Sequence, residues 1–216
     1  MINDERLTDY INSLAKPLPE SLRKIEKEAL ENHVPIIRKD MQSLLCFLLK
    51  TTEPANILEV GCAVGFSALL MESCVDSCCR ITTIEKVPAR IAKARDNFEK
   101  LHKSERITLL EGDAVQLLQE LNREKKKYDF IFMDAAKGQY MNFFGDIYDM
   151  LEEKGMLVTD NVLQDGDIIK SRYAVTRRDR TIHGRMREYL YTLTHHQGLD
   201  TVILPVGDGV ALSVKG

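Results

Sequence analysis

Apolar positions follow two different spacings along the chain. Over residues 1–50 they recur every three or four positions in segments 21–33 and 41–50, which is the spacing of amphipathic helices. The residues expected to face inward in the first of these helices are Leu22, Ile25 and Ala29. We therefore expect this N-terminal part to supply helices that cover a larger core.

From residue 56 onward, short strand-like apolar runs alternate with helical segments. Stretches of helical length, such as 87–102 and 114–126, separate the first five runs, which implies parallel strands joined by crossover helices. Only the letters GDG separate the last two runs, so the sheet is expected to finish with an antiparallel strand. The predicted strands are 56–60, 81–85, 106–112, 128–134, 155–160, 201–206 and 210–214. This pattern predicts an α/β fold with a seven-stranded, mostly parallel sheet and helices on both faces.

Length and charge limit the possible classes of protein. No linker, repeat or low-complexity tract divides the chain, so residues 1–216 are expected to form a single domain. The net charge of −3 excludes a polycation that binds nucleic acid through bulk charge. No apolar run has the length of a membrane span, and residues 1–10 lack the basic and apolar regions of a secretion signal. We expect a soluble cytoplasmic protein that does not associate with membranes.

The five cysteines do not favour a disulfide framework. Their number is odd, and two of them are adjacent. A zinc site is less favoured than simple packing, because the spacing of four ligands and nearby histidines are missing. The cysteines are Cys46, Cys62, Cys74, Cys78 and Cys79.

A glycine turn follows the first predicted strand, in the letters EVGCAVGFS from Glu59 to Ser67. Gly61 and Gly65 permit a tight turn and close approach of a ligand to the backbone, and the following helix offers free N–H groups. The spacing differs from the G-x-G-x-x-G fingerprint, which argues against a nicotinamide dinucleotide. Such a turn also occurs for packing reasons alone.

Acidic residues end the next two strands. Glu85 follows the first glycine at about the spacing at which an acidic side chain meets a ribose in such folds. Asp113, in the letters EGDA, is placed to accept a hydrogen bond from an adenine amino group. The alternative is that each acid caps a helix, and Asp113 before AVQLLQEL fits that role well.

Three oxygen-bearing side chains follow the fourth and fifth strands. Asp134 ends one strand, and Asp160 and Asn161 end its expected neighbour, so the three are predicted to converge. With no His or Cys among them, they suit Mg²⁺ or a similar hard divalent cation. The alternative is that one Asp caps a helix and Asn161 bonds to a turn.

The segment from Lys170 to Arg187 carries seven Lys or Arg residues and a single Asp. Arginine forks suit phosphates, and Tyr173 and His183 could stack on bases, which favours RNA as a partner. The alternative, a solvated helix face, usually includes alternating acids that are absent here. The predicted RNA-binding residues are Arg172, Arg177, Arg178, Arg180 and Arg185.

From about residue 33 to the end, the chain resembles the Mg²⁺-dependent O-methyltransferases related to catechol and caffeoyl-CoA methyltransferases. The resemblance rests on the motifs ILEVGCAVGFSALLM, FIFMDAAKGQYMNFF, LVTDNVL and ILPVGDGVALS. Within this family, the HVPII entry, the unbroken DAAKGQYMNFF and the arginine-rich stretch before REYLY most resemble bacterial tRNA 5-hydroxyuridine methyltransferases. Those enzymes convert 5-hydroxyuridine at the wobble position to 5-methoxyuridine.

The resemblance implies a class I, Rossmann-like methyltransferase fold, S-adenosylmethionine as methyl donor, and a homodimer. It implies that Asp134 touches both donor and metal, that Asp160 and Asn161 complete the metal site, and that Lys137 helps to deprotonate the acceptor hydroxyl. The implied donor-binding residues are Ile37, Glu59, Gly61, Ser67, Glu85, Asp113 and Ala114.

Three departures from the family pattern accompany this resemblance. Cys62 and Phe66 stand where close relatives often carry Thr and Tyr, and the letters QDGDIIKS are more acidic than expected near the substrate. A small catechol-like or CoA-linked phenol is an alternative acceptor to tRNA, in which case the arginines would lie at a dimer surface or bind an acidic group such as a CoA phosphate. A donor- or RNA-binding module without catalysis is a further alternative, against which the set of Asp134, Asp160, Asn161 and Lys137 argues.

Overall fold

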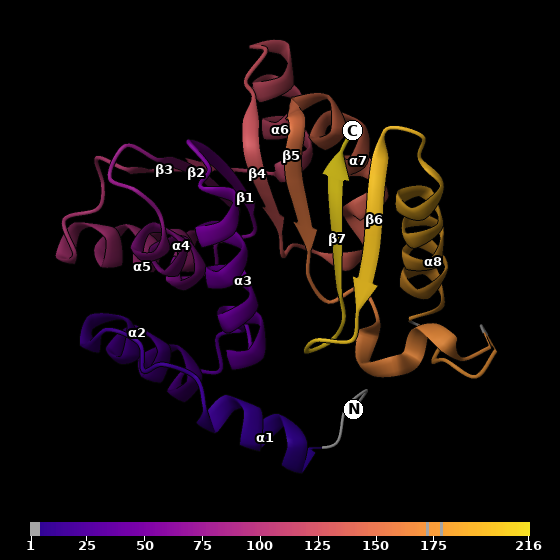
Figure 1. Cartoon of the computed structure of the whole chain (residues 1–216), viewed down its shortest axis with the longest axis horizontal. Coiled ribbons are helices and arrows are strands. Elements are labelled where there is room, and N and C mark those ends of the chain that lie inside the picture. Colours follow the sequence, from indigo (N-terminus) through magenta and orange to yellow (C-terminus); the bar gives the residue numbers. More distant parts are fainter. Residues whose placement is uncertain (1–4, 172, 178) are drawn as a thin grey trace.

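The computed structural model describes residues 5–171, 173–177 and 179–216. Arg172 and Arg178, both predicted to bind RNA, lie outside the described residues. Along the chain, helices alternate with the strands of a seven-stranded sheet, as Figure 1 shows. The strands are β1 (Asn56–Val60), β2 (Arg80–Glu85), β3 (Ile107–Glu111), β4 (Tyr128–Met133), β5 (Leu151–Thr159), β6 (Leu199–Leu204) and β7 (Val210–Lys215).

Eight α-helices and two 3₁₀ turns are found in the described part of the chain. The α-helices are α1 (Glu5–Ser13), α2 (Glu20–Glu31), α3 (Lys39–Thr52), α4 (Phe66–Cys74), α5 (Pro88–Lys100), α6 (Ala114–Arg123), α7 (Tyr140–Met150) and α8 (Arg180–His195). The 3₁₀ turns are η1 (Lys137–Gln139) and η2 (Gln164–Ile169).

The sheet has the strand order β3-β2-β1-β4-β5-β7-β6. The five strands β3, β2, β1, β4 and β5, in this order, pair in parallel. Strand β7 runs antiparallel to both β5 and β6, as the opposed arrows in Figure 1 show. The predicted mixed sheet is therefore confirmed. The order reverses between β1 and β4, and in such sheets a ligand binds outside the carboxyl ends of the strands at this point.

Both faces of the sheet are covered by helices. One apolar cluster joins residues of α2, α3, α4 and α5 to one face, and a second joins α6, α7 and α8 to the other. Alternate residues of β4 divide between them, with Phe130 and Phe132 in the first cluster and Ile131 and Met133 in the second. All four are fully buried, which is expected of a central strand covered on both sides.

The N-terminal helices were only partly predicted. Leu22, Ile25 and Ala29 of α2 are buried, as expected. Helix α1 was not predicted, and its Tyr10 and Ile11 are exposed.

The five cysteines are free thiols, which agrees with the absence of a predicted disulfide framework. Cys62 and Cys79 are buried as packing residues, but Cys78 is exposed and does not fill the core. No helix among the described residues is long and apolar enough to cross a membrane.

Candidate active site

The turn between β1 and α4 needs both of its glycines. Gly61 has φ +103°, and a Cβ there would lie 2.2 Å from the carbonyl oxygen of Asp134, so the end of β1 can approach this backbone only without a side chain. Gly65 has φ +80°, and its Cβ would lie 2.5 Å from the Phe98 ring. The packing explanation therefore holds for both glycines, and the same turn forms one wall of a cavity.

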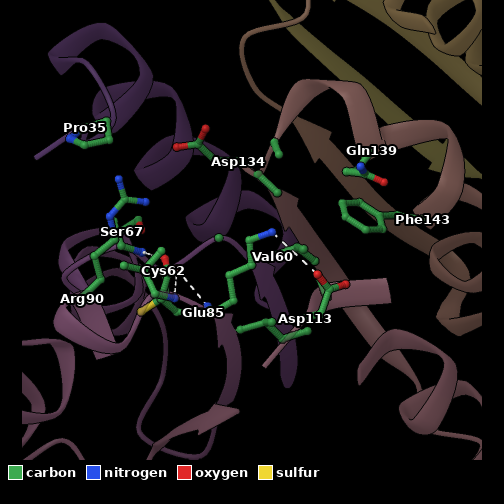
Figure 2. Close-up of a pocket in the computed structure, with 18 of the residues that line it drawn as sticks. Pro35, Val60, Cys62, Ser67, Glu85, Arg90, Asp113, Asp134, Gln139 and Phe143 are labelled. Atoms are coloured by element: carbon green, nitrogen blue, oxygen red, sulfur yellow. Dashed lines mark hydrogen bonds and ion pairs between the residues drawn. The ribbon is translucent and has the colours of Figure 1, made fainter. Parts of the chain in front are cut away.

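Glu85 joins two loops at the carboxyl ends of β1 and β2. One carboxylate oxygen accepts the backbone N–H of Ala63 at 2.8 Å, and the other accepts those of Lys86 and Val87, each at 2.9 Å. The side chain is buried, at 7% exposure, and Figure 2 shows it beside Cys62 at the base of the cavity. Sequence reasoning assigned Glu85 to a ligand and missed this second role, which fixes the glycine turn.

Asp113 is the N-cap of α6, as the alternative interpretation of this residue predicted. Its side chain accepts the backbone N–H of Val115 at 3.0 Å. Its second oxygen lies 3.6 Å from the Lys86 ammonium, an ion pair that Figure 2 marks with a dashed line at Asp113. The carboxylate therefore has two partners already and remains half-exposed toward the cavity.

A cavity of about 520 Å³ lies outside the carboxyl ends of β1, β2, β3 and β4. It is lined by most of the residues that were predicted to bind the donor or the metal. Those lining residues are Ile37, Gly61, Ser67, Glu85, Asp113, Ala114, Asp134 and Asn161. Gln139 and Phe143 also line it, which sequence reasoning missed, although DAAKGQYMNFF places both just after Asp134. In Figure 2 these two side chains lie across the cavity from Ser67 and Arg90.

Glu59 lies behind this cavity rather than in its lining. It is fully buried in β1, where one oxygen accepts the hydroxyl of Thr83 and the other has no hydrogen-bond partner. Burial raises the pKa of Glu59 to about 7, against the opposing effect of the Thr83 hydrogen bond. Glu59 therefore belongs to the interior behind the cavity, and its contact with the donor stays a prediction.

Asp134, Asp160 and Asn161 converge as predicted. Met133 and Thr159 are register partners at the ends of β4 and β5, so the residues that follow them emerge side by side. The N–H of Asp160 donates to the carbonyl of Met133 at 2.9 Å, and that of Asn161 donates to the Asp160 carboxylate at 2.7 Å. Asn161 has φ +60°, a left-handed conformation that asparagine tolerates better than most residues.

Burial disfavours negative charge where Asp134, Asp160 and Asn161 lie together, a place that we call the acidic edge. It raises the pKa of Asp134 to about 6, against the opposing charge of Lys137, and Asp208 raises it further. Burial raises the pKa of Asp160 to about 7, and the charge of Asp134 adds to this effect. Two buried carboxylates that repel each other are stabilised by a cation between them.

The donor set at this edge fits a hard cation. It consists of the carboxylates of Asp134 and Asp160 and the carboxamide of Asn161. Among the described residues, no group of three His, Cys, Asp or Glu side chains could hold a metal ion, so a site here needs the carboxamide as a third ligand. Oxygen ligands of this kind are those that Mg²⁺ or a similar ion takes, with water or substrate completing the coordination.

The basic segment, residues 170–187, borders the acidic edge. Arg185 of α8 donates a hydrogen bond to the carbonyl of Gly138 at 2.8 Å, next to Lys137. The Arg180 guanidinium lies 5.8 Å from the centre of the Tyr173 ring, and that ring is 83% exposed.

Two other side chains of the basic segment differ in their exposure. Arg177 is exposed to solvent, as a phosphate-binding residue requires. The expectation that His183 could stack on a base is wrong, because this side chain is 2% exposed on the inner face of α8.

The chain is similar to several known proteins over nearly its whole length. The family model described as O-methyltransferase matches residues 12–216. A caffeoyl-CoA O-methyltransferase of Citrus natsudaidai is 27% identical over 220 residues, which covers 98% of this chain and 95% of the relative. Similar solved structures include two that each cover 98% of this chain. A Staphylococcus aureus protein described as a candidate caffeoyl-CoA O-methyltransferase has a TM-score of 0.86 at 30% identity and 98% coverage of its own chain. The SAH-bound methyltransferase PaMTH1 of Podospora anserina has a TM-score of 0.85 at 26% identity and 94% coverage.

Proposed function

The chain belongs to the O-methyltransferase family, and we propose that it uses S-adenosylmethionine and Mg²⁺ to methylate 5-hydroxyuridine at the wobble position of tRNA. This proposal has three parts: a donor site in the cavity, a metal site at the acidic edge, and an RNA surface on the basic segment. Each part rests on different residues and can fail separately.

The cavity supports the donor part. Glu85 is the carboxylate that would accept the ribose hydroxyls, and Asp113 and Ala114 lie where the adenine would be held. Ser67 and the glycine turn would face the methionine end of the donor. SAH is bound to the similar Podospora anserina methyltransferase, which suits a donor of this class.

Asp134, Asp160 and Asn161 would hold a hard divalent cation, which when bound lowers the pKa of a hydroxyl that it ligates. In 5-hydroxyuridine the hydroxyl is adjacent to a carbonyl, so the base offers two oxygens as a catechol does. The chain then has to position the hydroxyl against the donor methyl, and such positioning contributes several kcal/mol to catalysis.

Lys137 is the residue we assign to the acceptor proton. It is half-buried in η1, and its positive charge opposes the raised pKa of both Asp134 and Asp160, so it lies close to the acidic edge. In its neutral form it would take the proton of the acceptor hydroxyl, and in its charged form it would hold the resulting oxyanion.

The contact between Arg185 and Gly138 is the observation that carries the choice of RNA. It fixes the first turns of α8 beside η1, so the basic segment borders the place where the acceptor would react. Arg180 begins the same helix and Arg177 precedes it by three residues, so both would be available near that acceptor to bind phosphates through their arginine forks.

A CoA-linked phenol is the second candidate, and it is suggested by the name of one relative. The Citrus natsudaidai relative is named a caffeoyl-CoA O-methyltransferase. CoA carries phosphates that the same arginines would bind, so charge alone does not separate the two substrates. Dependence on a polynucleotide does separate them.

We expect Glu85→Ala to weaken donor binding by about tenfold or more while changing kcat at saturating donor only slightly. Its bonds would go to hydroxyls remote from the methyl group and so contribute equally to ground and transition states. The measurements are the Kd of S-adenosylmethionine and steady-state kcat.

Glu111→Ala is the matched control for this variant. Glu111 also ends a strand, but it is exposed and pairs with Arg95 outside the cavity. A collapse of kcat in Glu85→Ala with an unchanged Kd would remove Glu85 from the donor site.

We expect the double variant Arg177→Gln and Arg180→Gln to lower tRNA affinity and to flatten its salt dependence. Each lost phosphate contact reduces the slope of log K against log salt by about 1. Affinity for S-adenosylmethionine should stay unchanged, because neither arginine lines the cavity. The measurement is tRNA binding at several salt concentrations.

The double variant Lys125→Gln and Lys126→Gln removes the same charge from the loop before β4, which lies at the amino end of this strand and so away from the acidic edge at its carboxyl end. This control should keep the slope of the unmodified protein. Equal slopes for all three proteins would exclude Arg177 and Arg180 from RNA binding.

A further inference from the structure

The turn between β6 and β7 packs against the loop that carries two of the candidate metal ligands. The N–H of Leu163 donates to the carbonyl of Asp208 at 2.8 Å, and the N–H of Val162 donates to that of Gly209 at 2.9 Å. A Cβ on Gly209 would lie 2.3 Å from the Leu163 side chain, so the two loops are in close contact. The position of Asn161 therefore depends on this turn.

The same turn also holds the N-terminal segment. The Arg38 guanidinium lies 2.7 Å from the Asp208 carboxylate, and the N–H of Gly207 donates to the Asp40 carboxylate at 2.9 Å. Arg38 directly follows residues 35–37, which line the cavity. One turn thus contacts both the metal-ligand loop and the wall of the donor cavity.

Asp208 also contributes charge to the acidic edge. Its side chain is 12% exposed, and its charge raises the pKa of both Asp134 and Asp160. The Arg38 side chain, 48% exposed, supplies the opposite charge at the outer side. A buried carboxylate that loses its cationic partner is costly unless another cation compensates it.

We propose that Arg38 and Asp208 form a positioning pair that joins the donor-cavity wall to the metal-ligand loop. Arg38 acts mainly on the donor side, by holding residues 35–37 against the cavity. Asp208 acts mainly on the metal side, by supporting the loop of Asp160 and Asn161 and by adding negative charge beside it. The inference rests on the proposed donor and metal sites and is independent of the RNA substrate.

The two residues should therefore respond differently to substitution. Arg38→Met releases residues 35–37 and leaves the acidic edge more negative, so donor affinity should fall about fivefold while cation affinity is kept or increases. Asp208→Asn keeps the shape of the side chain and its contact with Arg38 but removes its charge. Cation affinity should fall about tenfold, with a smaller loss of donor affinity.

The test measures binding and needs no turnover. Calorimetry with S-adenosylhomocysteine in EDTA gives donor affinity, and titration with Mn²⁺ followed by electron paramagnetic resonance gives cation affinity. Arg38→Lys, which retains the charge, should restore most of the donor affinity, and this rescue guards against a variant that merely unfolds.

Lys39→Met and Asp200→Asn are the matched controls. Lys39→Met removes a positive charge from an exposed neighbour of Arg38, and Asp200→Asn removes a negative charge from an exposed position on a distant strand. Both controls should bind donor and Mn²⁺ as the unmodified protein does. Equal losses of both ligands in Arg38→Met and Asp208→Asn, or no loss in either, would overturn the proposal. Neither measurement uses tRNA, so an unmodified protein that binds both ligands but does not methylate tRNA would count against the proposed substrate and leave this pair untouched.

Discussion

Replacing Asp160 by alanine is expected to abolish methyl transfer while leaving donor binding nearly intact. The substitution removes one of two carboxylates from the acidic edge, and Asp134 with Asn161 alone would hold a hard cation poorly. A bound cation stabilises the reacting oxygen by several kcal/mol, so activity should fall by about 1000-fold or more. The measurement is the rate of methyl transfer from isotopically labelled S-adenosylmethionine, together with Mn²⁺ affinity.

The fold should survive this change. Tyr140 donates its hydroxyl to the main-chain carbonyl of Asp160 at 3.2 Å, and the N–H of Asp160 bonds to Met133, so neither contact needs the carboxylate. Asp200→Ala, at an exposed acid of β6, serves as the control and should retain full activity. Equal activity of the unmodified protein in EDTA and in Mg²⁺ would contradict the metal assignment.

Lys137→Met is expected to lower kcat by about 100-fold or more at saturating donor and cation. The loss arises because the acceptor hydroxyl no longer has a nearby group to take its proton or to hold the oxyanion. Cation affinity should not fall, since a positive charge is removed from beside Asp134 and Asp160. The measurements are kcat, Mn²⁺ affinity and the Kd of S-adenosylhomocysteine.

Lys126→Met, an exposed lysine in the loop before β4, is the control for charge and expression. Full activity of Lys137→Met would show that Lys137 is only a solvated lysine at the start of a helix. Loss of Mn²⁺ binding in that variant would instead show that Lys137 supports the loop rather than the reaction.

The sheet and the acidic edge were predictable because they depend on local patterns. Strand-like apolar runs separated by helix-length stretches define the parallel strands, and a residue that directly follows such a strand must emerge at its carboxyl end. For this reason Asp134, Asp160 and Asn161 could be assigned to one edge before any coordinates were known. Their assigned roles in binding and catalysis remain predictions.

What could not be predicted depends on contacts between distant parts of the chain. Glu85 accepts the N–H of Ala63, which follows a different strand. Arg38 pairs with Asp208, which is far away from it in the sequence. His183 shows a related difficulty, because helical spacing alone did not identify which face of α8 packs inward. Side-chain partners of this kind follow from tertiary packing and leave no periodic signal in the sequence.

The measurement that tests the central claim most directly is mass spectrometry of nucleosides after one reaction. Purified protein is incubated with S-adenosylmethionine carrying a labelled methyl group, Mg²⁺, and tRNA that contains 5-hydroxyuridine, with caffeoyl-CoA and catechol in parallel reactions. We predict labelled 5-methoxyuridine from the tRNA, its loss in EDTA, and much slower methylation of both phenols. Efficient methylation of a phenol, with no labelled 5-methoxyuridine from the tRNA, would contradict the proposed function.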